Sequence, residues 1–292
     1  MECHTGGALE SPRIGVQIET CSTCNAACTF CPYITVAKSR SGQQMDMSLF
    51  TKIVDELATI PAVSDIKMIG LNEPLLDRRL EELIAYIKKV APRLTVGIYT
   101  NGTLLSPARH DSLRAVGLDN IIVSLNAVRP EQHEQIMRLK GKFDTVCKNV
   151  EYAISHITPP STVAVHTVFT GDTFTREDAN AFIARWGDVR SGGHGLVIRK
   201  TNWAGDISVH KSAVPLVFTN LWCFRATTQI YITYDGKVTA CCLDPLGKMT
   251  FGDLNTQTVR EVYNSKAYTD FREAHSKDEA DRYEMCRKCA RI

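Results

Sequence analysis

The sequence lacks a hydrophobic run of the eighteen or so residues that a membrane-spanning helix needs. It also lacks an excess of charge of either sign, because 34 Lys and Arg residues against 32 Asp and Glu residues leave a net charge of +2. The N-terminal stretch MECHTGGALESPR contains no apolar segment of the kind that a secretory signal requires. We therefore expect a cytoplasmic protein that binds neither nucleic acid nor a membrane.

Cysteine, in contrast, is abundant, and most of the 11 cysteines fall into two groups. Four lie between residues 21 and 31, and five lie between residues 223 and 289. A disulfide framework would spread cysteines along the chain and would require export. Reduced thiolates that hold metal therefore fit this pattern better.

The first 200 residues or so alternate between strand-like and helix-like segments, which predicts parallel strands joined by crossover helices. Ser48 and Thr175 are the expected N-caps of two of these helices. Periodicity alone leaves open whether the sheet closes into a barrel or stays open. Strands are expected at 13–20, 65–70, 94–100, 120–127, 162–169 and 195–200, and helices at 48–60, 78–90, 107–116, 130–156 (split near Gly141) and 175–186.

The pattern changes beyond residue 205, which predicts two domains, 1–205 and 206–292. Residues 228–242 form an expected β-hairpin with Asp235-Gly236 at its turn. Residues 258–275 read as one amphipathic helix, and a C-x2-C pair follows near the C-terminus.

The segment CSTCNAACTFCP, residues 21–32, carries the first cysteine group. Zinc ribbons usually separate their cysteine pairs by a longer loop, and the spacing also differs from that of bacterial ferredoxins. The subset Cys24-x3-Cys28-x2-Cys31 would hold a [4Fe–4S] cluster by three thiolates and leave one iron open. An open iron can coordinate a substrate, which a pure electron carrier does not need.

This spacing, placed directly after the first expected strand, resembles that of the radical S-adenosylmethionine (SAM) enzymes. The resemblance implies a partial (β/α)6 barrel in which the open iron binds the amino and carboxylate groups of SAM. One electron from the cluster then cleaves SAM to a 5′-deoxyadenosyl radical. An external reductant such as flavodoxin or ferredoxin would supply that electron. Cys21 lies outside the pattern and is expected to be a spare buried thiol.

Further segments resemble the SAM-binding motifs of this family. GLNEPLLD, residues 70–77, resembles its GGEP segment, although Leu71 and Asn72 depart from the double glycine. TNGTLL and SLNA, which begin at residues 100 and 124, resemble the ends of the third and fourth barrel strands, although Asn-Gly by itself is an ordinary turn. The SAM contacts that the resemblance implies are Phe30 (to adenine), Gly70, Glu73, Pro74, Thr100, Asn101, Ser124 and Asn126.

The second cysteine group could by itself be a zinc site. Beside the first group, it resembles the SPASM/twitch extension of radical SAM enzymes, a small α+β module with a hairpin and a helix that binds one auxiliary [4Fe–4S] cluster. The resemblance implies Cys223, Cys241, Cys286 and Cys289 as ligands. Neighbouring residues on a strand point to opposite faces, so we expect only one of Cys241 and Cys242 to reach the cluster. Cys242 would then be either a hydrogen-atom donor or a passive core thiol.

The chain resembles aminoglycoside-tailoring members of the family, the neomycin-type sugar epimerases and the aminocyclitol dehydrogenases. The resemblance implies a small polar substrate: a sugar, an aminocyclitol or an aminoglycoside. We expect an epimerase with Cys242 as the hydrogen-atom donor. The alternatives are a dehydrogenase that passes an electron to the auxiliary cluster, a peptide-modifying maturase, and two non-enzymes, a zinc-binding module and an iron–sulfur electron carrier.

Polar residues at strand positions that face a barrel interior are candidate substrate contacts. An internal hydrogen-bond network is the alternative role for them. The loop at residues 200–206 would close over the site. The candidate contacts are Gln17, Glu19, His166 and Arg199.

Overall fold

The computed structural model describes residues 13–40, 42–169, 173–187, 193–199, 223–244 and 246–289. Their strands form one sheet in the order β6-β5-β4-β3-β2-β1-β7-β8-β9. The six strands from β1 to β6 are all parallel, and each pairs with the next along the chain. They are β1 (Ile14–Ile18), β2 (Val63–Met68), β3 (Thr95–Thr100), β4 (Asn120–Ser124), β5 (Thr162–Phe169) and β6 (Gly193–Arg199).

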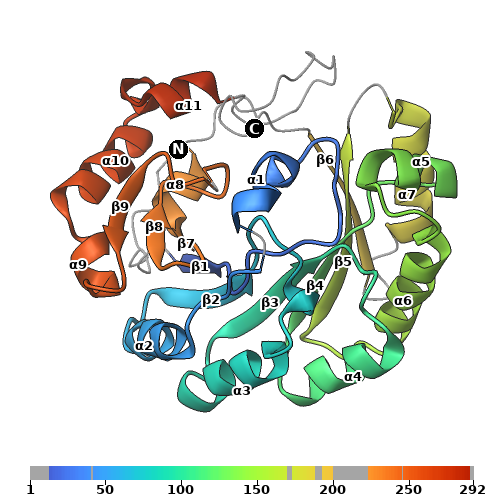
Figure 1. Cartoon of the computed structure of the whole chain (residues 1–292), viewed down its shortest axis with the longest axis horizontal. Helices are drawn as coiled ribbons and strands as arrows, with labels where there is room; N and C mark the ends of the chain where they lie inside the picture. The colour runs from blue at the N-terminus through green and yellow to red at the C-terminus, as the bar shows by residue number, and fades with distance from the viewer. Residues whose placement is uncertain are drawn as a thin grey trace, which may run out of the picture.

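The parallel strands curve into a partial barrel with helices around its outer face, as Figure 1 shows for α2, α3, α4 and α6. This confirms the predicted fold class, an α/β partial barrel followed by a small cysteine-rich module. The helices are α2 (Met47–Ala58), α3 (Leu80–Val90), α4 (Pro107–Ala115), α5 (Pro130–Met137), α6 (Phe143–Ser155) and α7 (Arg176–Trp186).

Local signals explain where the helices begin and end. Thr175 caps α7 as expected, in a capping box with Asp178. The expectation that Ser48 caps α2 is wrong, because Asp46 is the N-cap and its side chain accepts from the Ser48 amide. The expected break between α5 and α6 is present: Arg138 and Gly141 both adopt positive φ, at 59° and 64°.

The hydrophobic core lies between the strands and the outer helices. Alternate residues of each parallel strand point into it, as Val96 and Ile98 of β3 and Val163 and Val165 of β5 do. Burial of each such side chain contributes roughly 1.5–3 kcal/mol. The other face of these strands lines the barrel interior, where the polar candidates Gln17 and His166 lie.

One helix, α1 (Tyr33–Arg40), was not expected from the sequence. It follows the first cysteine loop directly and buries only Tyr33 and Arg40. Because it has no continuous apolar face, its sequence carries no amphipathic signal. A short 3-10 helix, η1 (Pro74–Leu76), follows β2.

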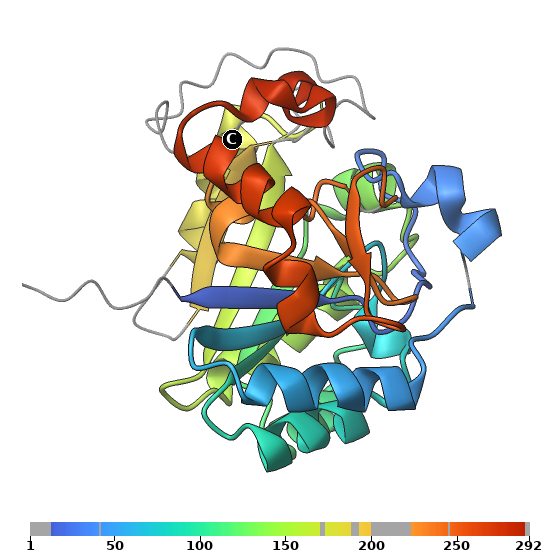
Figure 2. The same ribbon diagram turned by 90° about the vertical axis from the view of Figure 1, so that its left-hand side faces the viewer.

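The C-terminal strands extend the barrel sheet. β7 (Gln229–Ile232) pairs in parallel with β1, and β8 (Lys237–Thr239) and β9 (Thr250–Asp253) continue antiparallel. The predicted hairpin is present, with Gly236 at φ 83° in its turn. Figure 2 shows β1 running between α2 below and the C-terminal helices above. The domain boundary expected at residues 205 and 206 lies outside the described residues and stays a prediction.

The expected single helix at 258–275 is two helices, α9 (Val259–Tyr263) and α10 (Lys266–Ser276). Ser265 ends the run because its side chain accepts from the Tyr268 amide and caps α10. The remaining elements are α8 (Phe224–Thr228), η4 (Ala280–Arg282) and α11 (Glu284–Lys288). In the described part of the chain, no helix has the length and apolar character to cross a membrane.

Candidate functional site

The first cysteine group lines a cavity at the carboxyl ends of the barrel strands, where barrel enzymes place their chemistry. We call it the three-cysteine cavity. It brings together the loop after β1 and the segments that follow β2, β3 and β4. Every residue predicted to bind SAM lines it except Pro74, which begins η1 beside it. The predicted lining residues are Cys24, Cys28, Phe30, Cys31, Gly70, Glu73, Thr100, Asn101, Ser124 and Asn126.

Hydrogen bonds hold the cysteine loop in place. The Cys24 amide donates to the Tyr33 hydroxyl at 2.9 Å, which ties the loop to α1. The Thr29 amide donates to the Ile136 carbonyl at 2.9 Å, and the Cys28 thiol contacts the Met137 sulfur at 3.4 Å, which tie it to α5. The loop therefore presents its thiols from a fixed backbone.

The three thiols fit a metal cluster as ligands. Burial raises the pKa of Cys24 to about 12 and that of Cys31 to about 11, and it raises the pKa of Cys28 as well. The charges of Cys24 and Cys31 also raise the pKa of Cys28, so the three thiols are neighbours. Such thiolates need nearby cations, and iron in a cluster supplies them. Among the described residues, no three His, Cys, Asp or Glu side chains form a site for a single metal ion.

Glu73 organises the floor of this cavity. Its buried carboxylate accepts from the Thr100 hydroxyl at 2.7 Å, the Asn101 amide at 2.6 Å and the Leu75 amide at 3.1 Å. Burial raises its pKa to about 7. These bonds fix the end of β3 against the segment after β2. A direct contact between Glu73 and SAM stays a prediction.

Asn126 holds a strained turn at the end of β4. Its φ of 55° lies in the left-handed region, where asparagine is one of the few tolerated residues. Its side-chain oxygen accepts from the Val168 amide at 2.9 Å, which joins β4 to β5. Asn101 donates to the Asn25 side chain at 2.7 Å and so links β3 to the cysteine loop.

A second cavity adjoins the first and is lined by Cys241 and Cys242; we call it the double-cysteine cavity. The two cavities share Ile69, Gly70 and Leu71 in their walls. Gly70 is required there, because a Cβ would lie 2.6 Å from the Glu19 side chain. The shared wall therefore joins the three-cysteine cavity to a second cavity that Cys241 and Cys242 line.

Cys241 and Cys242 both lie beyond the end of β8, and not within a strand as the prediction assumed. A turn follows that strand, in which the Asp244 amide donates to the Cys241 carbonyl at 2.9 Å. Strand alternation therefore does not apply, and both residues line the same cavity. Which of them binds a cluster stays a prediction.

The predicted auxiliary ligands come from α8, α11 and the turn after β8, and Cys241 in that turn lines the double-cysteine cavity. Cys223 is the N-cap of α8, Cys286 lies in α11 and Cys289 is its C-cap. Burial raises the pKa of Cys241 well above its ordinary value, and nearby Cys242, Cys223 and Cys289 raise it further. These thiols are therefore neighbours, which suits a shared cluster.

Two predicted substrate contacts, Gln17 on β1 and Glu19 just after it, line the double-cysteine cavity. The Gln17 side-chain amide donates to Oε1 of Gln229 at 3.1 Å, and the Tyr231 hydroxyl donates to the same Oε1 atom. The Glu19 carboxylate is already engaged, since it accepts from Arg40 at 2.5 Å and from the Leu71 amide at 2.8 Å. Glu19 thus belongs to an internal network, the alternative that the sequence left open.

The other two predicted contacts lie on β5 and β6. His166 is half-buried, and its ring meets the Tyr99 ring edge-on at 6.0 Å. Arg199 ends β6, but its side chain is outside the described residues, as is the loop at 200–206.

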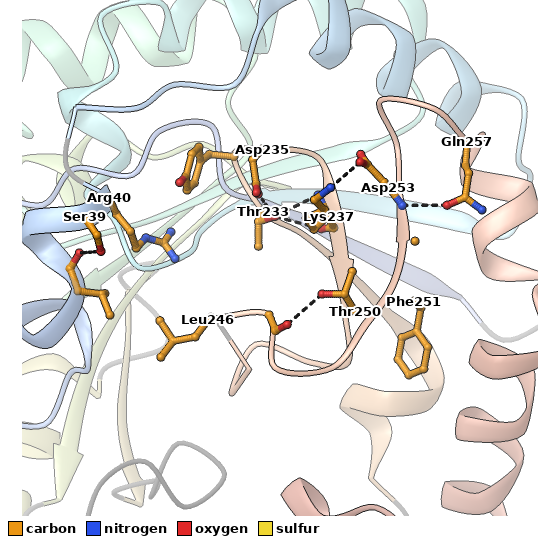
Figure 3. Close-up of a pocket in the computed structure, with 14 residues that line it drawn as sticks. Ser39, Arg40, Thr233, Asp235, Lys237, Leu246, Thr250, Phe251, Asp253 and Gln257 are labelled. Atoms are coloured by element: carbon orange, nitrogen blue, oxygen red, sulfur yellow. Dashed lines mark hydrogen bonds and ion pairs between the residues drawn. The ribbon is translucent and has the colours of Figure 1, made fainter.

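Arg40 is one of the residues that line an outer groove of about 750 Å³. Figure 3 shows the residues around this groove. Thr233 lines both this groove and the double-cysteine cavity, so the Arg40–Glu19 pair stands between the two. Lys237 and Asp253 pair at 2.5 Å within the groove. Asp235 also lines the groove, which therefore holds charged groups of both signs.

Sequence reasoning missed Arg40, Tyr99 and Tyr231 as site residues. Tyr99 lines the three-cysteine cavity, and Tyr231 lines the double-cysteine cavity. Both tyrosines are polar residues at strand positions that face the barrel interior, the criterion that selected Gln17, so the sequence could have identified them. No signal marked Arg40, which lies in the unexpected helix α1.

Comparison with known proteins gives two family matches and several relatives. Residues 18–183 match the radical SAM superfamily, and residues 223–290 match the SPASM family, an iron–sulfur cluster-binding domain. The S-adenosyl-L-methionine-dependent 2-deoxy-scyllo-inosamine dehydrogenase of Niallia circulans is 20% identical over 95% of this chain and 92% of its own length. A probable GTP 3′,8-cyclase of Methanocella arvoryzae is 32% identical but matches only 48% of this chain and 43% of its own length.

Two solved structures share the fold. BtrN in complex with AdoMet and 2-DOIA gives a TM-score of 0.66 at 19% identity, covering 97% of this chain and 95% of that one. Native anSMEcpe with bound AdoMet gives a TM-score of 0.68 at 16% identity, covering 93% of this chain and 87% of that one. The family matches confirm the predicted cofactors, SAM with a [4Fe–4S] cluster in the barrel and auxiliary iron–sulfur binding at the C-terminus. With more than half of its length matched, from β1 into α7, the chain belongs to the radical SAM superfamily.

Proposed function

We propose that this radical SAM enzyme oxidises a secondary alcohol on the ring of an aminocyclitol or amino sugar to a ketone. The observation that carries the proposal is the double-cysteine cavity, which shares a wall with the three-cysteine cavity and is itself lined by Cys241 and Cys242. A substrate bound there lies within reach of both cofactor sites. The dehydrogenase relative, which aligns over nearly the whole of both chains, supports an aminocyclitol as the substrate class.

The chain's own residues prepare this site. Cys24, Cys28 and Cys31 would hold the SAM-binding cluster, and Cys223, Cys286, Cys289 and one of the paired cysteines would hold the auxiliary one. When bound, these groups supply a 5′-deoxyadenosyl radical that abstracts hydrogen and an acceptor for the electron left behind. Gln17 and Tyr231 offer an amide and a hydroxyl to ring substituents, while Ile69, Leu71 and Leu243 give the cavity apolar walls that exclude water.

Epimerisation, which the sequence favoured, becomes the second candidate. The relative's activity favours oxidation. The position of Cys242 still supports epimerisation, because its thiol lies in the cavity wall where it could return a hydrogen atom to a substrate radical. Membership of an enzyme superfamily sets aside the zinc-module and electron-carrier alternatives. The peptide-modifying alternative and the identity of the reductant stay predictions.

The test uses the anaerobically reconstituted full chain with SAM, dithionite and a panel of aminocyclitols and amino sugars. The panel includes 2-deoxy-scyllo-inosamine and its 3-epimer. Oxidation gives a product two hydrogens lighter than the substrate and one 5′-deoxyadenosine per ketone. A product of unchanged mass with one inverted carbon would replace this proposal by the epimerase. SAM cleavage with no change in any ring compound would contradict both.

A further inference from the structure

His166 lies on the inner wall of the barrel beside the three-cysteine cavity. It pairs in register with Ser124 of β4, and Ser124 lines that cavity. Val168, two residues further along the same face of β5, also lines it. Tyr99, whose ring meets the His166 ring edge-on, is a third lining residue. The imidazole therefore lies on the face of the barrel wall that borders the three-cysteine cavity, where SAM would bind.

Within the described residues, the ring nitrogens of His166 have no hydrogen-bond or ion-pair partner. The side chain is half-buried and remains accessible to a ligand. Burial lowers its pKa to about 4, so the imidazole is neutral near pH 7. A neutral imidazole keeps one nitrogen free to accept a proton.

The other polar groups described around the two cavities are less available to take a proton. The Glu73 carboxylate already accepts from the Thr100 hydroxyl and from the Asn101 and Leu75 amides. The Glu19 carboxylate is occupied by Arg40 and the Leu71 amide. Burial raises the pKa of Tyr99 and Tyr231, so both phenols stay protonated. Gln17 and Ser124 have no basic group. Oxidation of an alcohol must nevertheless release the hydroxyl proton, because a ketone product cannot keep it.

We propose that His166 is the general base that takes this hydroxyl proton, a role that rests on the proposed oxidation. The hydrogen atom on the carbinol carbon leaves to the 5′-deoxyadenosyl radical and forms 5′-deoxyadenosine. The hydroxyl proton passes to a ring nitrogen of His166. The remaining electron passes to the auxiliary cluster as the C=O double bond forms. The substrate thus loses two protons and two electrons in total, one of each as the hydrogen atom.

The test compares His166→Ala and His166→Asn with the wild type, all with reconstituted clusters and a substrate that the wild type oxidises. Removal of a general base should lower kcat for ketone formation by about 10²–10⁴-fold. KM and the iron content should change little. Because hydrogen abstraction does not need the base, 5′-deoxyadenosine should still form. A substrate radical protonated at oxygen should accumulate in the EPR spectrum of rapidly frozen samples.

Added imidazole provides a readout that a structural role would not show. Imidazole should raise the rate of ketone formation by His166→Ala at least ten-fold, because the shortened side chain leaves room for it. The increase should be much smaller for His166→Asn. His156→Ala serves as the matched control, because His156 is exposed at the end of α6 and should leave the rate unchanged.

A higher KM with unchanged kcat, or loss of ketone without rescue or radical accumulation, would make His166 a binding or packing residue and overturn the proposal. If His166→Ala fails to fold, an unimpaired kcat in His166→Asn would overturn it as well. Failure of the wild type to oxidise any alcohol would refute the proposed function itself, and that outcome is seen before any variant is made.

Discussion

Arg40 and Glu19 form a buried ion pair, with 2.5 Å between the guanidinium nitrogen and the carboxylate oxygen. The pair joins parts of the chain that are distant in sequence. Glu19 follows β1 and accepts from the Leu71 amide beyond β2, while its own amide donates to the Ile232 carbonyl of β7. Arg40 ends α1 and lies 5.1 Å from the ring centroid of Tyr234. One ion pair thus connects the wall of the outer groove, through Arg40, to the wall of the double-cysteine cavity, through Glu19.

Arg40→Met should destabilise the protein strongly. It leaves the Glu19 carboxylate buried without its cation, a change that typically costs about 3–5 kcal/mol. The double variant Arg40→Met with Glu19→Gln should recover part of the loss, because no uncompensated charge remains. Thermal melting of the reconstituted proteins measures both effects. Equal melting temperatures for Arg40→Met and the wild type would show that the pair contributes little.

The two cysteine groups should differ in what their loss abolishes. Cys24→Ala, Cys28→Ala or Cys31→Ala should eliminate SAM cleavage, because each removes a predicted ligand of the SAM-binding cluster. Cys286→Ala and Cys289→Ala should retain part of the cleavage while product formation and stability fall. Cleavage assays by liquid chromatography, with iron analysis of each variant, separate the two cases. Complete loss of SAM cleavage in folded variants of both groups would refute this division.

Cys242→Ala distinguishes oxidation from epimerisation. If the enzyme is a dehydrogenase, the variant should still form ketone, whose carbonyl carbon carries no hydrogen that D2O could label. If Cys242 returns hydrogen, the variant should cleave SAM but yield little inverted product, and the wild type should place one deuterium at the inverted carbon. Mass spectrometry and NMR of the product decide between them.

Asp178 should stabilise the folded state in a pH-dependent manner. Burial raises its pKa, but hydrogen bonds from the Thr175 amide, Arg129 and Gln132 outweigh that effect and leave the pKa below its ordinary 3.8. A lowered pKa stabilises the fold above that ordinary value, and the contribution is lost as the pH falls through the folded-state pKa.

Asp178→Asn should therefore cost about 1–3 kcal/mol near neutral pH, as expected for loss of hydrogen bonds to a charged group. The difference in melting temperature between variant and wild type should shrink as the pH is lowered from about 6 to about 3. Exposed Asp144→Asn is the control and should shift the melting temperature little at either pH. A difference that stays constant with pH would show that the Asp178 charge has no part in it.

Local sequence patterns predicted most of the barrel, because each parallel strand and each helix has its own hydrophobic periodicity and the helices have their own capping residues. The pairing of β7 with β1 could not be predicted in this way, since it joins residues more than 200 positions apart. Helices α9 and α10 appeared as one because their apolar periods run on across Ser265. The spacing of Cys24, Cys28 and Cys31 placed them correctly in one loop, whereas the partners of Glu19 depend on tertiary packing.

Strand β1 has hydrogen-bonded neighbours along both edges, β2 on one side and β7 on the other. A protein shortened to its first 205 residues would expose the β7-facing edge of β1, with its backbone donors and acceptors unpaired. Such an edge readily pairs with another chain. The C-terminal segment therefore also protects the barrel from aggregation by covering this strand edge. A gene that encodes the barrel alone should yield insoluble protein for this reason, independently of the loss of the auxiliary cysteines.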